Sequence, residues 1–391
     1  PAGQGCAACP SAKGTLHLPS GAWIQCLILL SILIFSARIE AQNPAADFHY
    51  TIEAGQVTLT DYIGSATSVV VPGEIEGLPV TAVGGWTFTR NDTLLNVELP
   101  DTVSRIGVEA FSYCRNLEEV ALGSGVTQMG SYAFYGCSGL VTLELPEGLT
   151  QIGPNAFGGC LNLIHMALPP GLTRLEDGVF YGCSRLESVE LPQGLTFIGK
   201  EVFSRCYNLA AIEIGSAVES VDSSAFAYCT SLTGFDVASD NPNYSSLEGS
   251  LCNKNETLLL ICPAGKRGIF TLPDSIVNFL ENAFQGCIYL TDFAVNENHP
   301  VFSSRDGILY NRAGDTLMVF PAGRTGQCVI QEGTTTLKAR SFSDSSLLGL
   351  ILPASLTHIE ARAFWYCSSL MGIGFEGNAP ETGADIFYSV P

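Results

Sequence analysis

The stretch LPDTVSRIGVEAFSYCRNLEEVAL, residues 99–122, decides the fold, because most of the chain repeats it. Aligning the chain on Phe111 of this stretch gives a series of phenylalanines at a constant step of 23 residues. They are Phe88, Phe111, Phe134, Phe157, Phe180, Phe203 and Phe226. The step widens to 58 residues for Phe284 and again for Phe342, then returns to 22 and 23 for Phe364 and Phe387. A fixed period of this size predicts a stack of structural repeats.

Within one repeat, the apolar residues show two different spacings. Leu117, Val120 and Leu122 end in a period-two alternation, which indicates a β-strand. A Pro or Gly follows in most copies and ends the strand, because Pro has no N–H to donate. The second half, which contains Ala-Phe-x-x-Cys, is predicted to return the chain to its starting side through about one helical turn.

A single repeat cannot bury its own apolar face, whereas stacked repeats share one core. The pattern matches the leucine-rich repeat, with its L-x-x-L-x-L strand followed by a breaker and a return path. We therefore expect an α/β repeat fold, a right-handed leucine-rich repeat solenoid of about eleven 23-residue units. A parallel β-sheet should line its concave side.

The repeated pattern L-P-x-x-[VLI]-x-x-I-G-x-x-A-F-x-x-C resembles that of the BspA-like (Treponema-type) leucine-rich repeat family of bacterial surface proteins. The resemblance covers about Phe48 to Pro391, with local departures: Gln331 replaces the Pro, and Ser345 and Asn91 replace the Cys. The resemblance implies a secreted or cell-surface protein that adheres to other cells or to host matrix proteins such as fibronectin and fibrinogen.

The N-terminal region carries an apolar run, AWIQCLILLSILIF, at residues 22–35. This run is shorter than the ~20 residues of a membrane-spanning helix but has the length of a signal-peptide core. We predict that residues 1–41 are a signal peptide or an N-terminal membrane-targeting segment, with an uncleaved anchor as the alternative. Export would place the protein outside the cell or on its surface.

The remaining chain divides into a cap and a solenoid. Residues 42–83 read as a β-hairpin followed by short strands, which predicts an N-terminal β cap, because terminal repeats must cover the end of the core. Residues 84–391 are the predicted solenoid. The sequence stops part-way through what reads as another unit, so we expect the C-terminus to be truncated.

Two insertions, near residues 238–272 and 296–330, account for the two long steps and resemble each other. Asp306-Gly307 and Gly314-Asp315 are turn signals between apolar runs, which predicts a β-hairpin budding from the solenoid edge in each insertion. Insertions at one point of a repeat lie on one face, which often binds a partner. A purely structural elaboration is the alternative.

The sequence offers no constellation of catalytic residues. Eight cysteines three residues after the repeated Phe form a ladder, and we predict that they are buried free thiols: Cys114, Cys137, Cys160, Cys183, Cys206, Cys229, Cys287 and Cys367. Cys6-x-x-Cys9 has no second pair of the kind that a zinc site needs. We therefore predict no enzyme, no metal site and no cofactor.

The charge is strongly biased, with a net charge of −20 although only 14% of residues are charged. Nucleic acids and anionic membranes select for Lys and Arg and are therefore excluded as partners, so that membrane contact is expected only through the N-terminal segment or a missing anchor. Residues that flank the buried strand position are predicted to point out of the concave side. The candidate binding residues there are Glu98, Glu119, Glu144, His165, Glu190, Glu213, Asp236 and Asp292.

These features lead to two hypotheses. The first is a non-catalytic, adhesin-like protein whose acidic surface binds an extracellular protein or glycan, including a basic protein. The second is a structural spacer or scaffold that presents another module. In both cases the acidic residues could instead serve to keep the sheet soluble.

Overall fold

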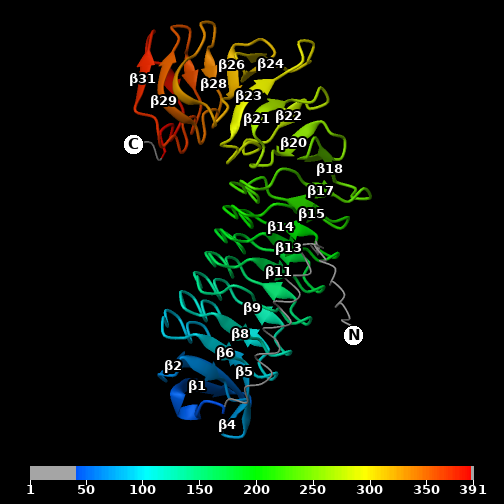
Figure 1. Ribbon diagram of the computed structural model, residues 1–391, viewed down its shortest axis with the longest axis vertical. Helices are drawn as coiled ribbons and strands as arrows, with labels where there is room; N and C mark the ends of the chain where they lie inside the picture. The colour runs from blue at the N-terminus through cyan, green and yellow to red at the C-terminus, as the bar shows by residue number, and fades with distance from the viewer. Residues whose placement is uncertain (1–40, 389–391) are drawn as a thin grey trace, which may run out of the picture. The chain divides into compact units, whose positions relative to one another are not determined.

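The computed structural model describes residues 41–388. The chain winds through successive turns, and most turns contribute short strands to two rows, which we call the first row and the second row (Figure 1). The predicted signal segment and the Cys6-x-x-Cys9 pair lie outside the described residues. No helix in the described part of the chain is long and apolar enough to cross a membrane.

Within each row, runs of neighbouring strands pair in parallel, such as Asn96–Glu98 with Glu119–Ala121 and Phe197–Ile198 with Ser220–Val221, and the pairing is interrupted between runs. The first row consists of β3 (Ser68–Val70), β6 (Asn96–Glu98), β8 (Glu119–Ala121), β11 (His165–Ala167), β13 (Ser188–Glu190), β15 (Glu213–Ile214), β17 (Asp236–Val237), β21 (Gly268–Thr271), β23 (Leu290–Ala294), β27 (Thr325–Val329), β29 (Ser346–Leu352) and β31 (Gly372–Phe375). The second row consists of β2 (Gln56–Tyr62), β5 (Leu78–Val83), β7 (Arg105–Ile106), β9 (Gln128–Met129), β10 (Gln151–Ile152), β12 (Arg174–Leu175), β14 (Phe197–Ile198), β16 (Ser220–Val221), β20 (Leu258–Ile261), β22 (Asn278–Phe279), β26 (Thr316–Val319), β28 (Thr336–Leu337), β30 (His358–Ile359) and β32 (Glu381–Thr382).

The period-two pattern of the sequence places its residues as predicted in the first row. In β8 the middle residue, Val120, is buried, while Glu119 before it is exposed. Because successive side chains of a strand point to opposite faces, the buried residue joins the core and its neighbours face outward. The leucine-rich repeat solenoid predicted from the sequence is therefore confirmed.

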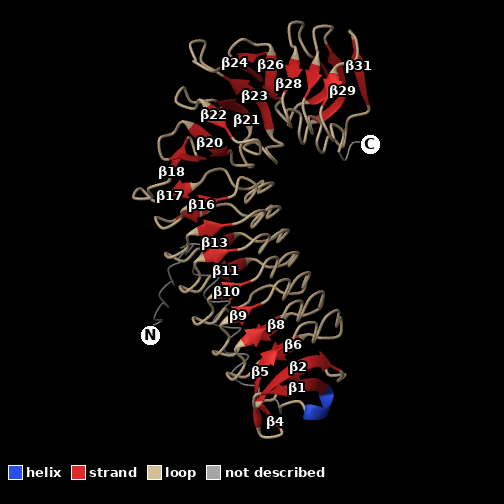
Figure 2. Ribbon diagram, turned by 180° about the vertical axis from the view of Figure 1, so that it is seen from behind, coloured by secondary structure: helices blue, strands red, loops and turns tan. Residues whose placement is uncertain are grey.

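The segment that leads from the second row to the first row contains the repeated phenylalanine, and we call it the Phe loop. Among the described residues this loop contains no α-helix, and the only helical segment is the short 3-10 helix η1 (Ala45–Asp47), drawn in blue in Figure 2. The predicted helical turn at Ala-Phe-x-x-Cys is wrong. Glu109 and Tyr113, two residues before and two after Phe111, have φ values of 55° and 59°. Residues in the left-handed region cannot continue a right-handed helix.

Backbone hydrogen bonds join each Phe loop to the next one instead. The amide of Phe111 donates to the carbonyl of Ala133 at 2.8 Å, and the amide of Tyr113 donates to the carbonyl of Tyr135 at 2.6 Å. The buried phenylalanine rings stack between turns, with the Phe88 and Phe111 centroids 4.9 Å apart and the Phe134 and Phe157 centroids 5.8 Å apart. The 23-residue period thus becomes a continuous column of rings in the core.

The N-terminal segment forms antiparallel strands at one end of this column. Strand β1 (Phe48–Glu53) pairs with β2, and Ala54 and Gly55 between them have φ values of 49° and 74°. Two positive φ values suit the tight turn of a two-residue hairpin. The short strand β4 (Glu74–Ile75) pairs with β5. The ring centroids of Phe48 and Tyr62 lie 6.4 Å and 5.2 Å from that of Phe88, so these two rings cover the N-terminal end of the column.

Each insertion contains an antiparallel hairpin and one further turn. The hairpins are β18 (Tyr244–Leu247) with β19 (Ser250–Asn253), and β24 (Phe302–Arg305) with β25 (Ile308–Asn311). The hairpins do not project from the edge of the solenoid as predicted. Strands β19 and β25 are largely buried, and each also pairs with a second-row strand, β20 and β26 respectively. The solenoid has about 14 turns rather than the expected eleven, since the two insertions and the N-terminal segment contribute turns of their own.

Candidate functional site

The candidate binding residues lie on the outward face of the first row, which we call the first-row face. Parallel pairing aligns them in two columns. Asn96 pairs with Glu119 in one column, and Glu98 pairs with Ala121 in the other. Glu213 pairs with Asp236, which continues the column of Glu98. Glu144 follows Ala121 by 23 residues, although residues 142–144 are not assigned as a strand.

Most of these carboxylates are exposed to solvent. Five of them are exposed: Glu119, Glu144, Glu190, Glu213 and Asp236. We call these five residues the acidic row. Glu98, His165 and Asp292 are half-buried.

The acidic row places like charges on neighbouring turns. Glu190, Glu213 and Asp236 follow one another at one-turn intervals, and Glu213 and Asp236 lie directly opposite each other on paired strands, which are about 4.8 Å apart in a sheet. Like charges directly opposite each other on a sheet destabilise it. Within residues 41–388, the only ion pair that any of the five carboxylates forms is a 3.8 Å contact between Glu190 Oε1 and His165 Nε2. The acidic row therefore carries largely uncompensated negative charge.

His165 belongs to this surface but is held by its neighbours. Its Nδ1 lies 2.8 Å from the Ser188 hydroxyl oxygen, on the adjacent strand. The His165 side chain is only 17% exposed, whereas that of Glu190 is 76% exposed. Since both ring nitrogens already face a polar neighbour, His165 orients Glu190 more than it offers a free group to a partner.

Asp292 differs from the acidic row, because a cation from the second insertion neutralises it. Arg324 Nη2 lies 2.6 Å from Asp292 Oδ1, and Arg324 Nε donates to the Thr291 carbonyl at 2.7 Å. Burial by itself raises the pKa of Asp292, but hydrogen bonds from Arg324 and Thr291 outweigh it and leave the pKa below its ordinary value. The structure thus separates Asp292 from the other candidates.

A second cation occupies the matching position in the first insertion. Lys266 donates from Nζ to the carbonyl of Glu248 at the hairpin tip, just as Arg324 donates to the carbonyl of Asp306. The tips themselves reach the first row: the Phe235 amide donates to the Gly249 carbonyl at 2.9 Å, and the corresponding bond in the second insertion is 2.8 Å long. The purely acidic part of the face therefore ends at Asp236, where the insertions begin.

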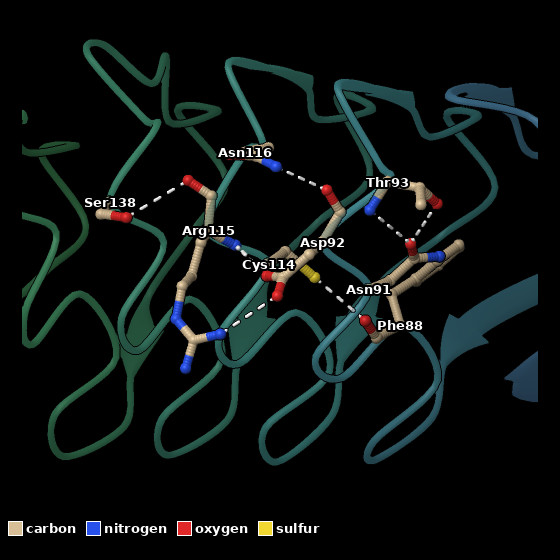
Figure 3. Close-up of polar contacts among 8 residues, drawn as sticks. All are labelled: Phe88, Asn91, Asp92, Thr93, Cys114, Arg115, Asn116 and Ser138. Carbon is tan, nitrogen blue, oxygen red and sulfur yellow. Dashed lines mark hydrogen bonds and ion pairs between the residues drawn. The ribbon is translucent and has the colours of Figure 1, made fainter.

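The predicted cysteine ladder is buried, and its thiols are free. Each thiol also makes a hydrogen bond that the sequence did not indicate. Cys114 Sγ donates to the carbonyl of Phe88 at 3.0 Å, as Figure 3 shows beside the Asp92–Arg115 ion pair. The same bond recurs at Cys137, where Sγ donates to the Phe111 carbonyl at 3.0 Å.

Burial also makes these thiols chemically inert. It raises the pKa of Cys114 to about 12 and that of Cys160 to about 12. The thiolate is the nucleophilic and metal-binding form of cysteine, so it is not populated here at neutral pH. In the part of the chain that the structure describes, no three His, Cys, Asp or Glu side chains are grouped so that they could hold a metal ion.

Comparison with known families places this geometry among leucine-rich repeat proteins. The profile of the BspA type leucine rich repeat region, in six copies, matches residues 81–184, 150–253 and 324–391. These ranges together cover more than half of the chain. No curated protein matches it.

Solved structures with a similar fold come from bacteria. A leucine rich cell surface protein from Faecalibacterium prausnitzii is 22% identical, with 88% of this chain and 96% of that chain covered and a TM-score of 0.63. A leucine-rich repeat protein from Bacteroides ovatus is 21% identical, with 90% and 92% covered and a TM-score of 0.51. The leucine rich repeat protein of T. pallidum is 30% identical over 43% of this chain and 91% of that one, with a TM-score of 0.40.

Proposed function

This chain belongs to the BspA-type leucine-rich repeat family, and on that basis we propose that it is a non-catalytic, adhesin-like binding protein displayed outside the cell. Its binding surface is the acidic row on the first-row face. Its partner is a basic segment of an extracellular protein. The main support for this proposal is a row of exposed carboxylates, none of which forms an ion pair with Lys or Arg within residues 41–388.

The repeat stack supports a binding role because it gives a long surface of fixed spacing. Stacked Phe rings and the thiol-to-carbonyl hydrogen bonds join every turn of residues 84–229 to the next one. A solenoid of this kind presents an extended surface to a partner. Neighbouring turns repeat the same residue types, which suits an extended binding surface better than a set of catalytic groups that meet at one point.

The charge of the acidic row selects the partner. Bringing Glu190, Glu213 and Asp236 onto consecutive turns costs free energy through like-charge repulsion. A partner that carries Lys or Arg side chains would relieve this repulsion on binding. Electrostatic complementarity of this type raises the association rate and sets the choice of partner.

Display outside the cell is supported by two independent features. The apolar run at residues 22–35 has the length of a signal-peptide core. The Faecalibacterium prausnitzii protein with the same fold is described as a cell surface protein. Under this proposal, the solenoid is exposed to proteins and glycans of the surroundings.

The test is a surface plasmon resonance screen with the full chain. Immobilised fibronectin, fibrinogen, other matrix proteins, glycans and unrelated basic proteins are compared in about 0.1 M and about 1 M salt, between which the Debye length falls from about 10 Å to about 3 Å. We expect at least one basic protein to bind in low salt and to dissociate in high salt. Replacing Glu119, Glu144, Glu190 and Glu213 together by Gln should abolish that binding.

Two outcomes would overturn the proposal. Binding that is indifferent to salt and to the four substitutions would place the contact surface elsewhere on the solenoid. No binding to any protein or glycan would instead favour the spacer role, in which the solenoid only separates other modules.

A further inference from the structure

A cavity of about 320 Å³ opens beside the second insertion, and it uses none of the residues of the acidic row. It lies between the Phe loop of residues 281–287 and that of residues 338–343. Met318, Val319 and Phe320 from the inserted turn line its third side. A cavity of this size is at the lower end of the range for small-molecule sites.

The cavity exists because the inserted turn has no Phe loop. Only residues 320–324 join β26 to β27, whereas residues 107–118 join β7 to β8 in the regular stack. The shorter path leaves unfilled the space that a Phe loop would occupy between its two neighbours. At the first insertion the backbones of the neighbouring loops pack directly on each other, since a Cβ on Gly286 would lie 2.4 Å from the backbone nitrogen of Tyr228. At the second insertion side chains bridge the two loops, as where the Gly286 amide donates to Asp344 Oδ2 at 3.1 Å.

One side of the cavity is apolar and aromatic. Phe279 and Phe284 line it and are half-buried, with ring centroids 5.6 Å apart and nearly perpendicular planes. Met318 and Val319 beside them are also half-buried. These side chains offer an apolar surface that a ligand could cover with its own apolar face.

The rim is charged but electrically balanced. Arg340 Nε lies 2.9 Å from Glu281 Oε1, and Lys338 Nζ lies 2.9 Å from Glu360 Oε1. Each charged group at the rim already has a partner of opposite sign. A charged ligand would have to break one of these pairs, so the rim favours an uncharged ligand.

The walls also contain polar groups whose hydrogen-bonding capacity is unused. Within the described residues, Asn282 Oδ1, Ser341 Oγ and Ser343 Oγ are buried without a hydrogen-bond partner, and all three residues line the cavity. An unsatisfied buried polar group costs about 1–3 kcal/mol. A serine hydroxyl can rotate among staggered positions, so Ser341 and Ser343 can turn toward a ligand that supplies the missing partner.

We propose that this cavity binds a single uncharged sugar ring, the size of one residue of a glycan. A sugar ring matches three properties of the cavity. Its small volume fits the space, its lack of charge suits the paired charges of the rim, and it has hydroxyl groups beside an apolar face. The ring packs on Phe279 and Phe284, and its hydroxyl groups reach Asn282, Gln285 and the serines. The site is independent of the acidic row.

The test measures binding of the full chain to the methyl glycosides of glucose, galactose, mannose and N-acetylglucosamine. Saturation-transfer NMR detects binding, and isothermal titration calorimetry gives the dissociation constant. The blocking variant is Ser343→Tyr. Tyrosine occupies the corresponding position, one residue after the repeated Phe, at Tyr135 and Tyr181, so the Phe loop accepts it. We expect at least one glycoside to bind the wild type and Ser343→Tyr to weaken it by more than about tenfold, or 1.4 kcal/mol.

The matched control is Tyr181→Ser, the reverse exchange in the regular stack, and it should bind as the wild type does. Phe279→Leu, which keeps an apolar side chain but removes a ring, provides a second variant and should also weaken binding. Thermal melting checks that each variant is folded.

Three results would overturn the proposal. The first is the absence of saturation transfer to any glycoside, which would mean that the cavity holds only water. The second is undiminished binding by a folded Ser343→Tyr or Phe279→Leu variant, which would place the sugar elsewhere. The third is binding of N-acetyltryptophanamide without binding of any sugar, which would make the cavity an acceptor for apolar side chains.

Discussion

The regular stack of residues 84–229 and the insertion region of residues 238–345 are built from the same repeat, but their side chains meet different partners. In the regular stack every turn has the same length, so each residue contacts its own counterpart one turn away. Phe157 stacks on Phe180 with centroids 5.6 Å apart, and Cys183 Sγ donates to the Phe157 carbonyl at 3.1 Å. The ring stacking and the thiol-to-carbonyl bond recur at each turn of this stretch.

Where the step widens to 58 residues, from the end of the regular stack onward, unlike residues meet across neighbouring Phe loops. Tyr228 Oη donates to Asp344 Oδ1 at 2.7 Å, and Asn282 Nδ2 donates to Ser223 Oγ at 3.4 Å. Phe284 leaves the ring column and contacts Phe293 edge-on at 5.2 Å. Equal turns therefore provide the stable scaffold, whereas unequal turns create polar networks and the cavity.

The largest expected difference between the two regions concerns the ring column. Phe157 is fully buried between two stacked rings, whereas Phe284 is half-buried. Phe157→Ala should therefore lower the free energy of unfolding by about 3–5 kcal/mol, and Phe284→Ala by clearly less. Urea unfolding followed by circular dichroism measures both. Equal losses would mean that the ring column is no more important than the irregular cluster.

A smaller difference is expected for ion pairs. Arg340 pairs with Glu281, lies 4.8 Å from the Trp365 ring centre and has a side chain that is only 14% exposed. Arg115 pairs with Asp92 at 3.1 Å, but its side chain is 57% exposed.

Arg340→Ala should accordingly cost about 1–3 kcal/mol of unfolding free energy, and Arg115→Ala less than about 1 kcal/mol. Urea midpoints measured in low and high salt check this expectation, because salt should weaken the exposed pair more. A larger loss for Arg115→Ala would contradict the distinction between the two regions.

The smallest expected effect concerns how Asp344 and Asp101 change the free energy of unfolding with pH, in opposite directions. Burial raises the pKa of Asp344 above the ordinary 3.8, although hydrogen bonds from Tyr228 and Gly286 partly offset it. The pKa of Asp344 is higher in the folded state than in the unfolded state, so its contribution to stability falls as the pH rises from 3.8 toward the raised value.

Asp101 behaves in the opposite way, because the backbone amide and then the hydroxyl of Ser124 lower its pKa. Its contribution is present above 3.8 and is lost as the pH falls through the lowered value.

Urea unfolding of the wild type, Asp344→Asn and Asp101→Asn across the acidic range measures these contributions. The difference between wild type and Asp344→Asn should decrease with rising pH, while the difference between wild type and Asp101→Asn should increase. Slopes of the same sign would show that the two carboxyl groups are not held in different environments.

The sequence predicted the repeat because its dominant signal is periodic. The recurrence of the phenylalanine at Phe111 and at its counterparts already implies that equal rings lie one turn apart, as the ring column confirms. The left-handed residues of the Phe loop were missed, since Glu109 and Tyr113 are not typical of positive φ. Other turns have a glycine at the position of Tyr113, namely Gly136 and Gly159, and these glycines could have indicated a positive φ there.

The candidate site was only partly predictable. The outward positions of Glu213 and Asp236 follow from the alternation within a strand, which the sequence contains. The ion pair between Asp292 and Arg324 joins residues 32 positions apart across an insertion, so no local pattern indicates it. The cavity likewise depends on the length of the inserted turn in three dimensions, which the period alone does not specify.

The association rate constants of two matched variants show whether the acidic row is a binding surface. Both variants exchange four exposed glutamates for glutamine. One changes Glu119, Glu144, Glu190 and Glu213 on the first-row face, and the other changes Glu53, Glu147, Glu201 and Glu219 away from it.

Surface plasmon resonance in about 0.1 M salt, with the basic protein that binds the wild type most tightly, compares them at equal net charge. We expect the first variant to associate at least about tenfold more slowly than the wild type, whereas the second should stay close to it. Equal slowing of both variants would show that the acidic row is not the binding surface, because the attraction would then come from the total charge of the protein.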